Sequence, residues 1–120
     1  MQEKASIKIE HANSIATVHF TSTSISNVED ITCASNHIKS FIDQHIPNVV
    51  LFDFAGVKFF SSQVLGLLLD IRGKMQTHNG KVVISAVNPQ LYRVFKITNL
   101  DTIFEFFPDR ESAMQELRMK

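Results

Sequence analysis

The stretch VVLFDFAGVKFFSSQVLGLLL, residues 49–69, decides the fold of this chain. It opens with a nearly continuous apolar run headed by two valines, which is typical of a strand covered on both faces of a sheet. Gly56 interrupts the run, and Ser61 and Ser62 precede a second apolar block that is long enough to form a helix. Serine is a favoured N-cap because its side-chain oxygen accepts a hydrogen bond from the free N–H groups of the first helical turn. The stretch therefore predicts a buried strand that ends at Asp53 and a helix that begins at the two serines.

Asp53, Ser61 and Ser62 are the first candidates for a functional site. In open α/β sheets, ligands and partners bind at the carboxyl ends of the strands, where this strand-to-helix connection lies. Residue chemistry leaves two interpretations open for each of them. The serines serve either as plain N-caps or as a contact surface, and Asp53 either binds a cation or orients a phosphate, or caps a loop N–H.

The segments before the central strand predict a hairpin and a helix. Residues 6–10 and 14–20 alternate apolar and polar side chains, and the short polar link between them suggests a hairpin. A polar loop over residues 21–27 ends in Ser26 and Asn27, either of which could start a helix. Apolar residues then recur every three or four positions until Pro47, which predicts an amphipathic helix. That stripe consists of Val28, Ile31, Ala34 or Ser35, Ile38, Phe41 and Ile42.

The segments after Ser62 alternate between helices and strands. The second helix is predicted to be buried nearly all round in its first half, to approach the sheet closely at Gly66 and to end at Asn79-Gly80. A strand over residues 81–87 precedes Asn88-Pro89, an N-cap and first-turn proline that open a third helix. A last strand is expected over residues 103–106, and Asp109 is expected to cap a final helix whose inner face is Ala113, Met114 and Leu117.

Helices that alternate with strands after an N-terminal hairpin predict an α/β fold, called α+β by some conventions. The expected sheet is mixed, with an antiparallel hairpin and later strands that are parallel and joined by right-handed crossovers. About four helices are expected. No internal repeat or composition boundary divides the chain, so residues 1–120 are predicted to form a single domain.

Composition narrows the classes of function. The 120 residues are 44% hydrophobic and 20% charged, with a formal net charge of zero, which disfavours nucleic-acid binding. No apolar run approaches the roughly 20 residues that span a bilayer, and the N-terminus lacks the apolar middle of a signal peptide. A cytoplasmic protein without direct membrane insertion is therefore expected. Cys33 is the only cysteine and is expected to pack rather than react.

Catalytic and cofactor chemistry have no sequence signature here. The four glycines are dispersed and form no phosphate-binding loop. A serine nucleophile needs a base within hydrogen-bonding reach, and no residue is marked as the base for Ser62. The histidines show no metal-ligand spacing with cysteine or acids: His11, His19, His37, His45 and His78. We therefore expect no catalytic residue, no metal and no cofactor, and a module that works through protein contacts.

The sequence resembles the STAS domains, named for sulphate transporters and anti-sigma factor antagonists. The residues that carry the resemblance are 50–69, GKVVI at residues 80–84 and NLDTIF at residues 99–104. The similarity extends from the loop at Ile25 to Leu117, which is nearly the entire chain. In the antagonists, two apolar residues follow a Gly-Val turn and precede Asp, a phosphorylated Ser, Ser or Thr, Gly, Leu and Gly. Phe59-Phe60 match the apolar pair, Ser62 matches the phosphoacceptor, and Leu65-Gly66 match the last two positions.

Four positions depart from the antagonist pattern. Ser61 replaces the aspartate beside the phosphoacceptor and removes a carboxylate that a kinase would read. Gln63 replaces Ser or Thr, and Val64 replaces Gly, which stiffens the first turn of the helix. Ser26 stands after Ile25 where the antagonists tend to carry an acidic residue.

The resemblance implies a phosphorylation switch. An antagonist of this kind binds an anti-sigma factor that has ATP-dependent serine kinase activity, and releases it once phosphorylated on Ser62, with Ser61 as the second choice. The partner-binding residues would be Ser26, Asn27, Asp53, Ser61, Ser62 and Gln63. The alternatives are a constitutive scaffold or accessory subunit, stressosome-like or transporter-associated, and a small-ligand site near Asp53 and Ser62. The oligomeric state is left open, a monomer included.

Overall fold

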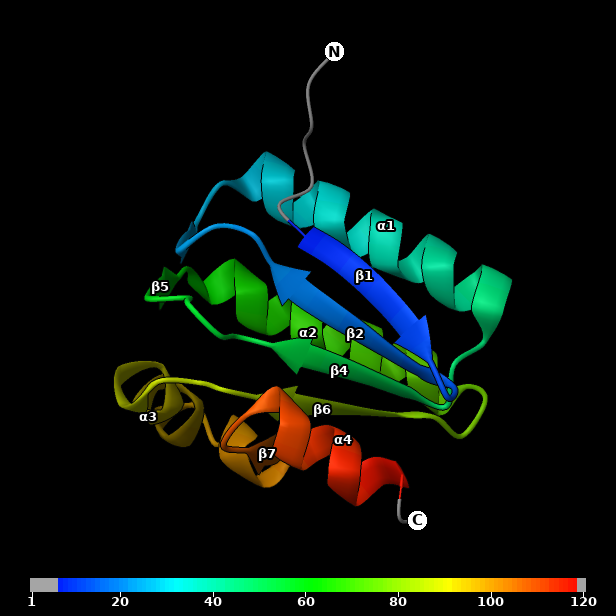
Figure 1. Ribbon diagram of the computed structural model, residues 1–120. Helices are drawn as coiled ribbons and strands as arrows, with labels where there is room; N and C mark the ends of the chain where they lie inside the picture. The colour runs from blue at the N-terminus through cyan, green and yellow to red at the C-terminus, as the bar shows by residue number, and fades with distance from the viewer. Residues whose placement is uncertain (1–6, 119–120) are drawn as a thin grey trace.

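The computed structural model describes residues 7–118, which form one five-stranded sheet, a separate two-stranded pair and the helices that cover them (Figure 1). The order along the chain is β1 (Ile7–Ala12), β2 (Ile15–Phe20), β3 (Ser24–Ile25), α1 (Val28–His45), β4 (Val49–Asp53), β5 (Phe59–Phe60), α2 (Ser62–Gln76), β6 (Lys81–Ser85), α3 (Pro89–Ile97), the 3₁₀ helix η1 (Leu100–Thr102), β7 (Glu105–Phe107) and α4 (Arg110–Arg118).

The sheet is mixed, as the sequence predicts. Its strand order is β1-β2-β4-β6-β7, with β1 antiparallel to β2 and every later neighbour parallel. The hairpin turn is Asn13-Ser14, and both residues have positive φ, 53° and 64°, which suits the twist of a two-residue hairpin. The α/β class, the N-terminal hairpin and the four α-helices are confirmed over residues 7–118. The predicted start of the first strand at Ser6 lies outside the described residues.

Strand β4 is the centre of the sheet, and all five of its residues are buried. Val50 and Phe52 belong to the main core beneath α1, α2 and α3. Val49 and Leu51 point to the other face, where they join a smaller core that includes Ala113 of α4. The continuous apolar run thus encodes a strand covered on both faces, as predicted.

Side-chain caps fix where three of the helices begin. Asn27 Oδ1 accepts a hydrogen bond from the Asp30 N–H at 2.9 Å, so Asn27 rather than Ser26 caps α1. Asn88 Oδ1 accepts from the Leu91 N–H at 2.8 Å, with Pro89 in the first turn of α3. Asp109 Oδ1 accepts from the Ser112 N–H at 2.7 Å. All three positions were predicted, because a cap and its partner lie only three residues apart.

Two predictions about α2 are wrong. The first half of the helix is not buried all round, because Leu69 is 39% exposed and Gly66 is exposed as well. Gly66 does not approach the sheet, and a Cβ built on it would meet no heavy atom within 4 Å. The close approach occurs at Gly80, where a Cβ would lie 2.6 Å from Met75 Cε and 3.1 Å from the Asn48 carbonyl oxygen.

Three predicted boundaries also move. α2 ends at Gln76, ahead of the predicted Asn79-Gly80. β6 ends at Ser85 rather than residue 87, because Ala86 has a φ of +62° and leaves the extended conformation. β7 begins at Glu105 rather than residue 103, because η1 occupies residues 100–102.

Candidate functional site

Ser62 is the first residue of α2 and is exposed. Its hydroxyl makes no hydrogen bond to any of residues 7–118. The first turn of α2 carries no acidic residue, so the positive end of the helix dipole is not neutralised by its own side chains. An exposed hydroxyl at such a helix end is open to an enzyme, and a negative group placed there is favoured electrostatically.

Ser61 occupies the N-cap position of α2 but does not cap it with its side chain. Its hydroxyl donates instead to Gln63 Oε1 at 2.8 Å. The prediction that a serine oxygen caps the first turn is therefore wrong for Ser61. Two of the four side chains that depart from the antagonist pattern thus bond to each other, one on each side of Ser62.

The two-stranded pair β3–β5 ties the start of α1 to the start of α2. The strands run parallel, with Ser24 opposite Phe59 and Ile25 opposite Phe60. The Ser61 N–H donates to the Ile25 carbonyl oxygen at 2.9 Å, which extends the pairing to Ser61, the N-cap residue of α2. Ser26 and Asn27, both exposed, follow directly and therefore lie on the same end of the molecule as the serines.

Asp53 is placed below this surface and is only 6% exposed. Its Oδ1 accepts from the Ala55 N–H at 3.1 Å and from Ser85 Oγ at 3.3 Å. Its Oδ2 lies 3.1 Å from His19 Nδ1. The geometry is that of the loop-cap interpretation: the carboxylate holds the turn after β4. Any contact of Asp53 with a partner stays a prediction.

His19 is a residue that the sequence reasoning missed. It stands opposite Asp53 in the β2–β4 register and bonds through its second nitrogen to Glu10 Oε1 at 3.2 Å. The hydrogen bond from His19 is the largest cause that lowers the pKa of Glu10 below its usual value, and Arg110, 3.8 Å away, adds to the effect. Only the strand register brings these groups together, so local sequence carried no signal for them.

A groove of about 310 Å³ lies between α1 and α2 next to the serines. Gly66 keeps its floor open because no side chain fills the space above the helix. The ion pair of Lys39 Nζ with Asp70 Oδ2, 2.6 Å apart, closes its far end. The groove is lined by Val28, Ile31, Thr32, Ser35, Asn36, Lys39, Gln63, Gly66, Leu67 and Asp70. The sequence signal for the groove was Gly66 inside an apolar helix. That glycine was predicted to face the sheet, whereas it faces the groove beside α1.

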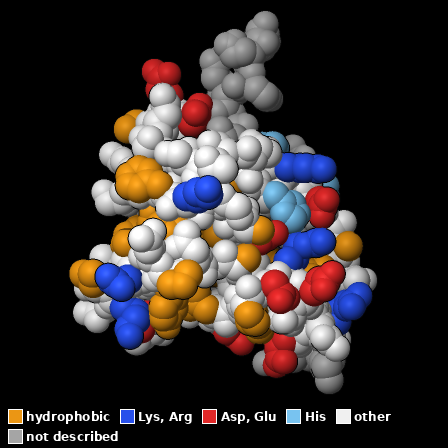
Figure 2. All heavy atoms as spheres, turned by 60° about the vertical axis from the view of Figure 1, so that its left-hand side comes forward, with side chains coloured by type: hydrophobic (Ala, Val, Ile, Leu, Met, Phe, Trp, Pro, Cys, Tyr) orange, Lys and Arg blue, Asp and Glu red, His pale blue; other side chains and the backbone are white. Residues whose placement is uncertain are grey.

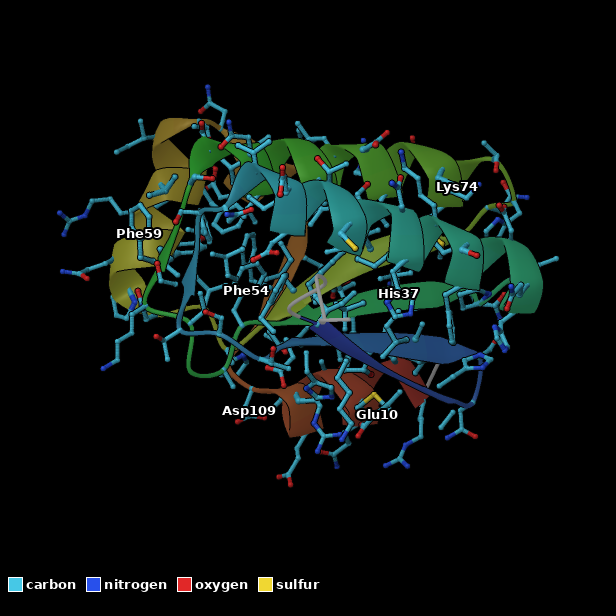
Figure 3. The ribbon with its side chains drawn as sticks, turned by 90° about the horizontal axis from the view of Figure 1, so that it is seen from above. Glu10, His37, Phe54, Phe59, Lys74 and Asp109 are labelled. Carbon is cyan, nitrogen blue, oxygen red and sulfur yellow. The ribbon has the colours of Figure 1, made fainter. Side chains whose placement is uncertain are left out.

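Large apolar side chains are exposed around the serines. Phe59 is 53% exposed and Val28 is 54% exposed, while Phe60 turns inward. In Figure 3, Phe59 lies at the end of the molecule beside α3, and Phe54 points into the interior. Figure 2 shows hydrophobic side chains at several places on this face. Exposed aromatic side chains near the centre of a face are typical of protein-binding surfaces.

Within residues 7–118, His, Cys, Asp and Glu side chains nowhere gather in groups of three or more that could hold a metal ion. None of the helices in this part of the chain combines the length and apolarity needed to cross a membrane.

Comparison with known families identifies the class. The STAS domain model matches residues 6–113, which is most of the chain. The chain therefore belongs to the STAS domain family.

Solved structures show the same fold. The anti-sigma factor antagonist SpoIIAA in its unphosphorylated form superposes with a TM-score of 0.81 at 16% identity, covering 95% of this chain and 97% of that one. An anti-sigma factor antagonist from Mycobacterium paratuberculosis gives 0.79 at 21% identity, with coverage of 93% and 92%. The murine Slc26a9 anion transporter gives 0.68 at 12% identity, but the match takes in 92% of this chain and only 19% of the transporter.

Proposed function

We propose that this protein is an anti-sigma factor antagonist that is switched by phosphorylation. Unphosphorylated, it binds an anti-sigma factor with ATP-dependent serine kinase activity in the cytoplasm; phosphorylated on Ser62, it releases that partner. The protein itself is not an enzyme. The observation that carries the proposal is the free, exposed hydroxyl of Ser62 at a helix N-terminus, on a fold shared with solved antagonists.

The switch acts through the surface rather than through unfolding. A phosphate on Ser62 adds about −1.5 to −2 charges at neutral pH, and the N-terminus of α2 accommodates them. The same group replaces a small neutral contact by bulk and charge, so a partner seated on this surface is repelled. A loss of about 1.4 kcal/mol of binding free energy already weakens affinity tenfold.

Phosphate transfer is tested by intact-mass measurement. The protein is incubated with ATP and its cognate anti-sigma kinase, and one added phosphate is expected. Ser62→Ala should remain unmodified, whereas the matched control Ser61→Ala should still gain the phosphate. An unchanged mass of the wild-type chain, or a Ser62→Ala variant modified at the wild-type rate, would contradict the proposal.

Binding of the same kinase is the second measurement, made by titration calorimetry. Ser62→Ala should bind as tightly as the unmodified wild type and stay bound in the presence of ATP. Ser62→Asp should bind about tenfold more weakly or worse, because it places a carboxylate where the phosphate would stand. Equal affinities for the two variants would argue against a charge-driven release.

A constitutive scaffold or transporter-associated subunit is the second candidate. The Ser61–Gln63 hydrogen bond favours it, because these residues replace two positions of the antagonist pattern and bond to each other on either side of the acceptor. A pull-down from native lysate separates the two functions. Recovery of a transporter ATPase or a large scaffold in place of a kinase would favour the second.

A further inference from the structure

The outward side of α3 lies at the same end of the molecule as Ser62. The proposed phosphorylation switch gives this side of α3 no role. In Figure 1, α3 lies at the same end of the molecule as β5 and the start of α2. The inner side of α3 carries Leu91 and Phe95, which are buried. Its outward side is a stripe that lines a shallow hollow of about 430 Å³: Pro89, Tyr92, Arg93, Lys96 and Ile97.

Two contacts join α3 to the segment that carries the serines, one from its N-cap Asn88 and one from its buried side. The Asn88 side-chain amide donates to the Val57 carbonyl oxygen at 3.1 Å. The Phe60 ring packs edge-on against Phe95, with ring centroids 5.8 Å apart. A partner that contacts Ser62 therefore meets Phe59 and the outward side of α3 as parts of one surface.

The two segments that carry Ser62 and α3 contain charged side chains of one sign, whereas the first turn of α1 carries the acidic residues Glu29 and Asp30. Residues 54–69 and 86–100 contain three cations, Lys58, Arg93 and Lys96, and no aspartate or glutamate. The whole chain is neutral, so the remaining residues carry three more acids than bases. Figure 2 shows Lys and Arg side chains beside hydrophobic ones on this face. Basic segments on the surface of a neutral protein attract acidic surfaces and repel basic ones.

Exposed apolar side chains stand in the same two segments as the cations. Ile97 is 74% exposed, Phe59 is 53% exposed and Tyr92 is 36% exposed. Aromatic and arginine side chains are the residue types that most often dominate binding energy at interfaces, where charged residues form the rim and apolar ones the centre. Ile97 would be the side chain that a partner must bury.

We propose that the anti-sigma kinase docks on a basic strip formed by Lys58, Phe59, Tyr92, Arg93, Lys96 and Ile97, and that its matching surface is acidic with an apolar centre. The inference rests on the proposed function and specifies the chemistry of the partner. It also explains why a phosphate on Ser62 is effective: it adds negative charge to the end of the molecule that attracts an acidic partner. Docking at the basic strip should accordingly weaken with salt.

The test is titration calorimetry with the kinase at about 50 mM salt, where charges are weakly screened, and at about 300 mM salt, where they are strongly screened. The double variant Arg93→Glu with Lys96→Glu should have an affinity for the kinase at least about tenfold lower at low salt, and its affinity should depend little on salt. The matched control Lys8→Glu with Arg118→Glu reverses two exposed charges on β1 and α4 and should stay within about twofold of wild type. Ile97→Ser, which changes no charge, should weaken binding while keeping the salt dependence. Thermal unfolding of each variant checks that it is folded.

Each outcome decides the inference. If the wild type binds the kinase and the α3 variants bind equally well, the inference fails and the proposed function stands. If the wild type does not bind the kinase at all, both fall. Vesicles of phosphatidylcholine with anionic phosphatidylserine form the last arm. If the α3 double variant loses vesicle binding while its kinase affinity is unchanged, the partner is a lipid surface and the inference is overturned.

Discussion

Asp53, a candidate site residue in the sequence, makes three hydrogen-bonding contacts that hold the fold together. Its carboxylate accepts from the Ala55 N–H and Ser85 Oγ and contacts His19, three groups from three different segments. Ser85 is fully buried. A buried donor that loses its acceptor costs more than the hydrogen bond itself contributes, because it has no water to replace the partner.

We expect Asp53→Ala to lower the free energy of unfolding by about 2–3 kcal/mol, since it leaves buried donors unpaired. Asp53→Asn should cost less, because its amide oxygen still accepts from Ala55 and Ser85. Urea unfolding monitored by circular dichroism measures both. If the two variants were as stable as the wild type but failed to bind the kinase, Asp53 would be a contact residue rather than a loop cap.

At the scale of single residues, sequence predicts what is local. The caps Asn27, Asn88 and Asp109 were found because each bonds to a backbone N–H three positions away. The partners of Asp53 are 32 and 34 residues distant and meet only through the register of β2, β4 and β6. The bond between Ser61 and Gln63 is local and was missed for a different reason, because serine before a helix is normally an N-cap.

Helix α2 is the element for which the structure and the prediction from the sequence differ most. Its closely spaced apolar residues suggested burial on all sides, but the structure leaves one side open at Gly66, Leu69 and Gly73. The apolar pattern could not show this, because neighbouring elements decide which apolar side chains of a helix are covered. The end of β6 was also misplaced, because the positive φ of Ala86 is not suggested by its residue type.

The two exposed glycines of α2 form a matched pair for testing the groove. A Cβ on Gly66 or on Gly73 would meet no atom within 4 Å, so either substitution by alanine should stabilise the helix by roughly 0.5–1 kcal/mol. Gly66 lines the groove beside Gln63, whereas Gly73 does not. We therefore expect Gly66→Ala to weaken kinase binding about fivefold, the equivalent of about 1 kcal/mol, and Gly73→Ala to leave it unchanged.

Thermal unfolding and calorimetry provide the two measurements. Equal stabilisation with unequal binding would place the groove in the interface. Unchanged binding by Gly66→Ala would remove the groove from it while leaving the role of Ser62 open to its own test.

For the molecule as a whole, the two faces of the sheet are covered unequally. Three helices pack over the main core, and the smaller core on the other face is closed by α4 through Ala113, which is fully buried. Figure 1 shows α4 on the opposite side of the sheet from α1 and α2. Stability therefore depends strongly on the last helix of the chain.

Ala113→Asp should lower the free energy of unfolding by at least about 3 kcal/mol, because it buries a charge against Leu51 and Val83. Gln115→Asp is the matched control on the exposed side of the same helix and should stay within about 0.5 kcal/mol of wild type. Denaturant unfolding compares them. Equal stability of the two variants would mean that α4 is dispensable for the core.

The sequence was most informative about the fold of the molecule as a whole. The alternation of strands and helices and the resemblance of residues 50–69 to the STAS pattern were sufficient for the class, the hairpin and the parallel strands. The pair β3–β5 was not foreseen, because a strand of two residues has no periodicity to detect. The basic strip was missed because a net charge of zero for the whole chain conceals its uneven distribution.

The pair β3–β5 also bears on the kinetics of the proposed kinase binding. Because it fastens the beginnings of α1 and α2 together, the proposed partner would meet an already assembled surface and little conformational entropy would be lost on association. Encounter then depends on diffusion and orientation rather than on loop rearrangement, and differences among complexes arise chiefly in the dissociation rate. The duration of the signal would follow from how long each complex survives.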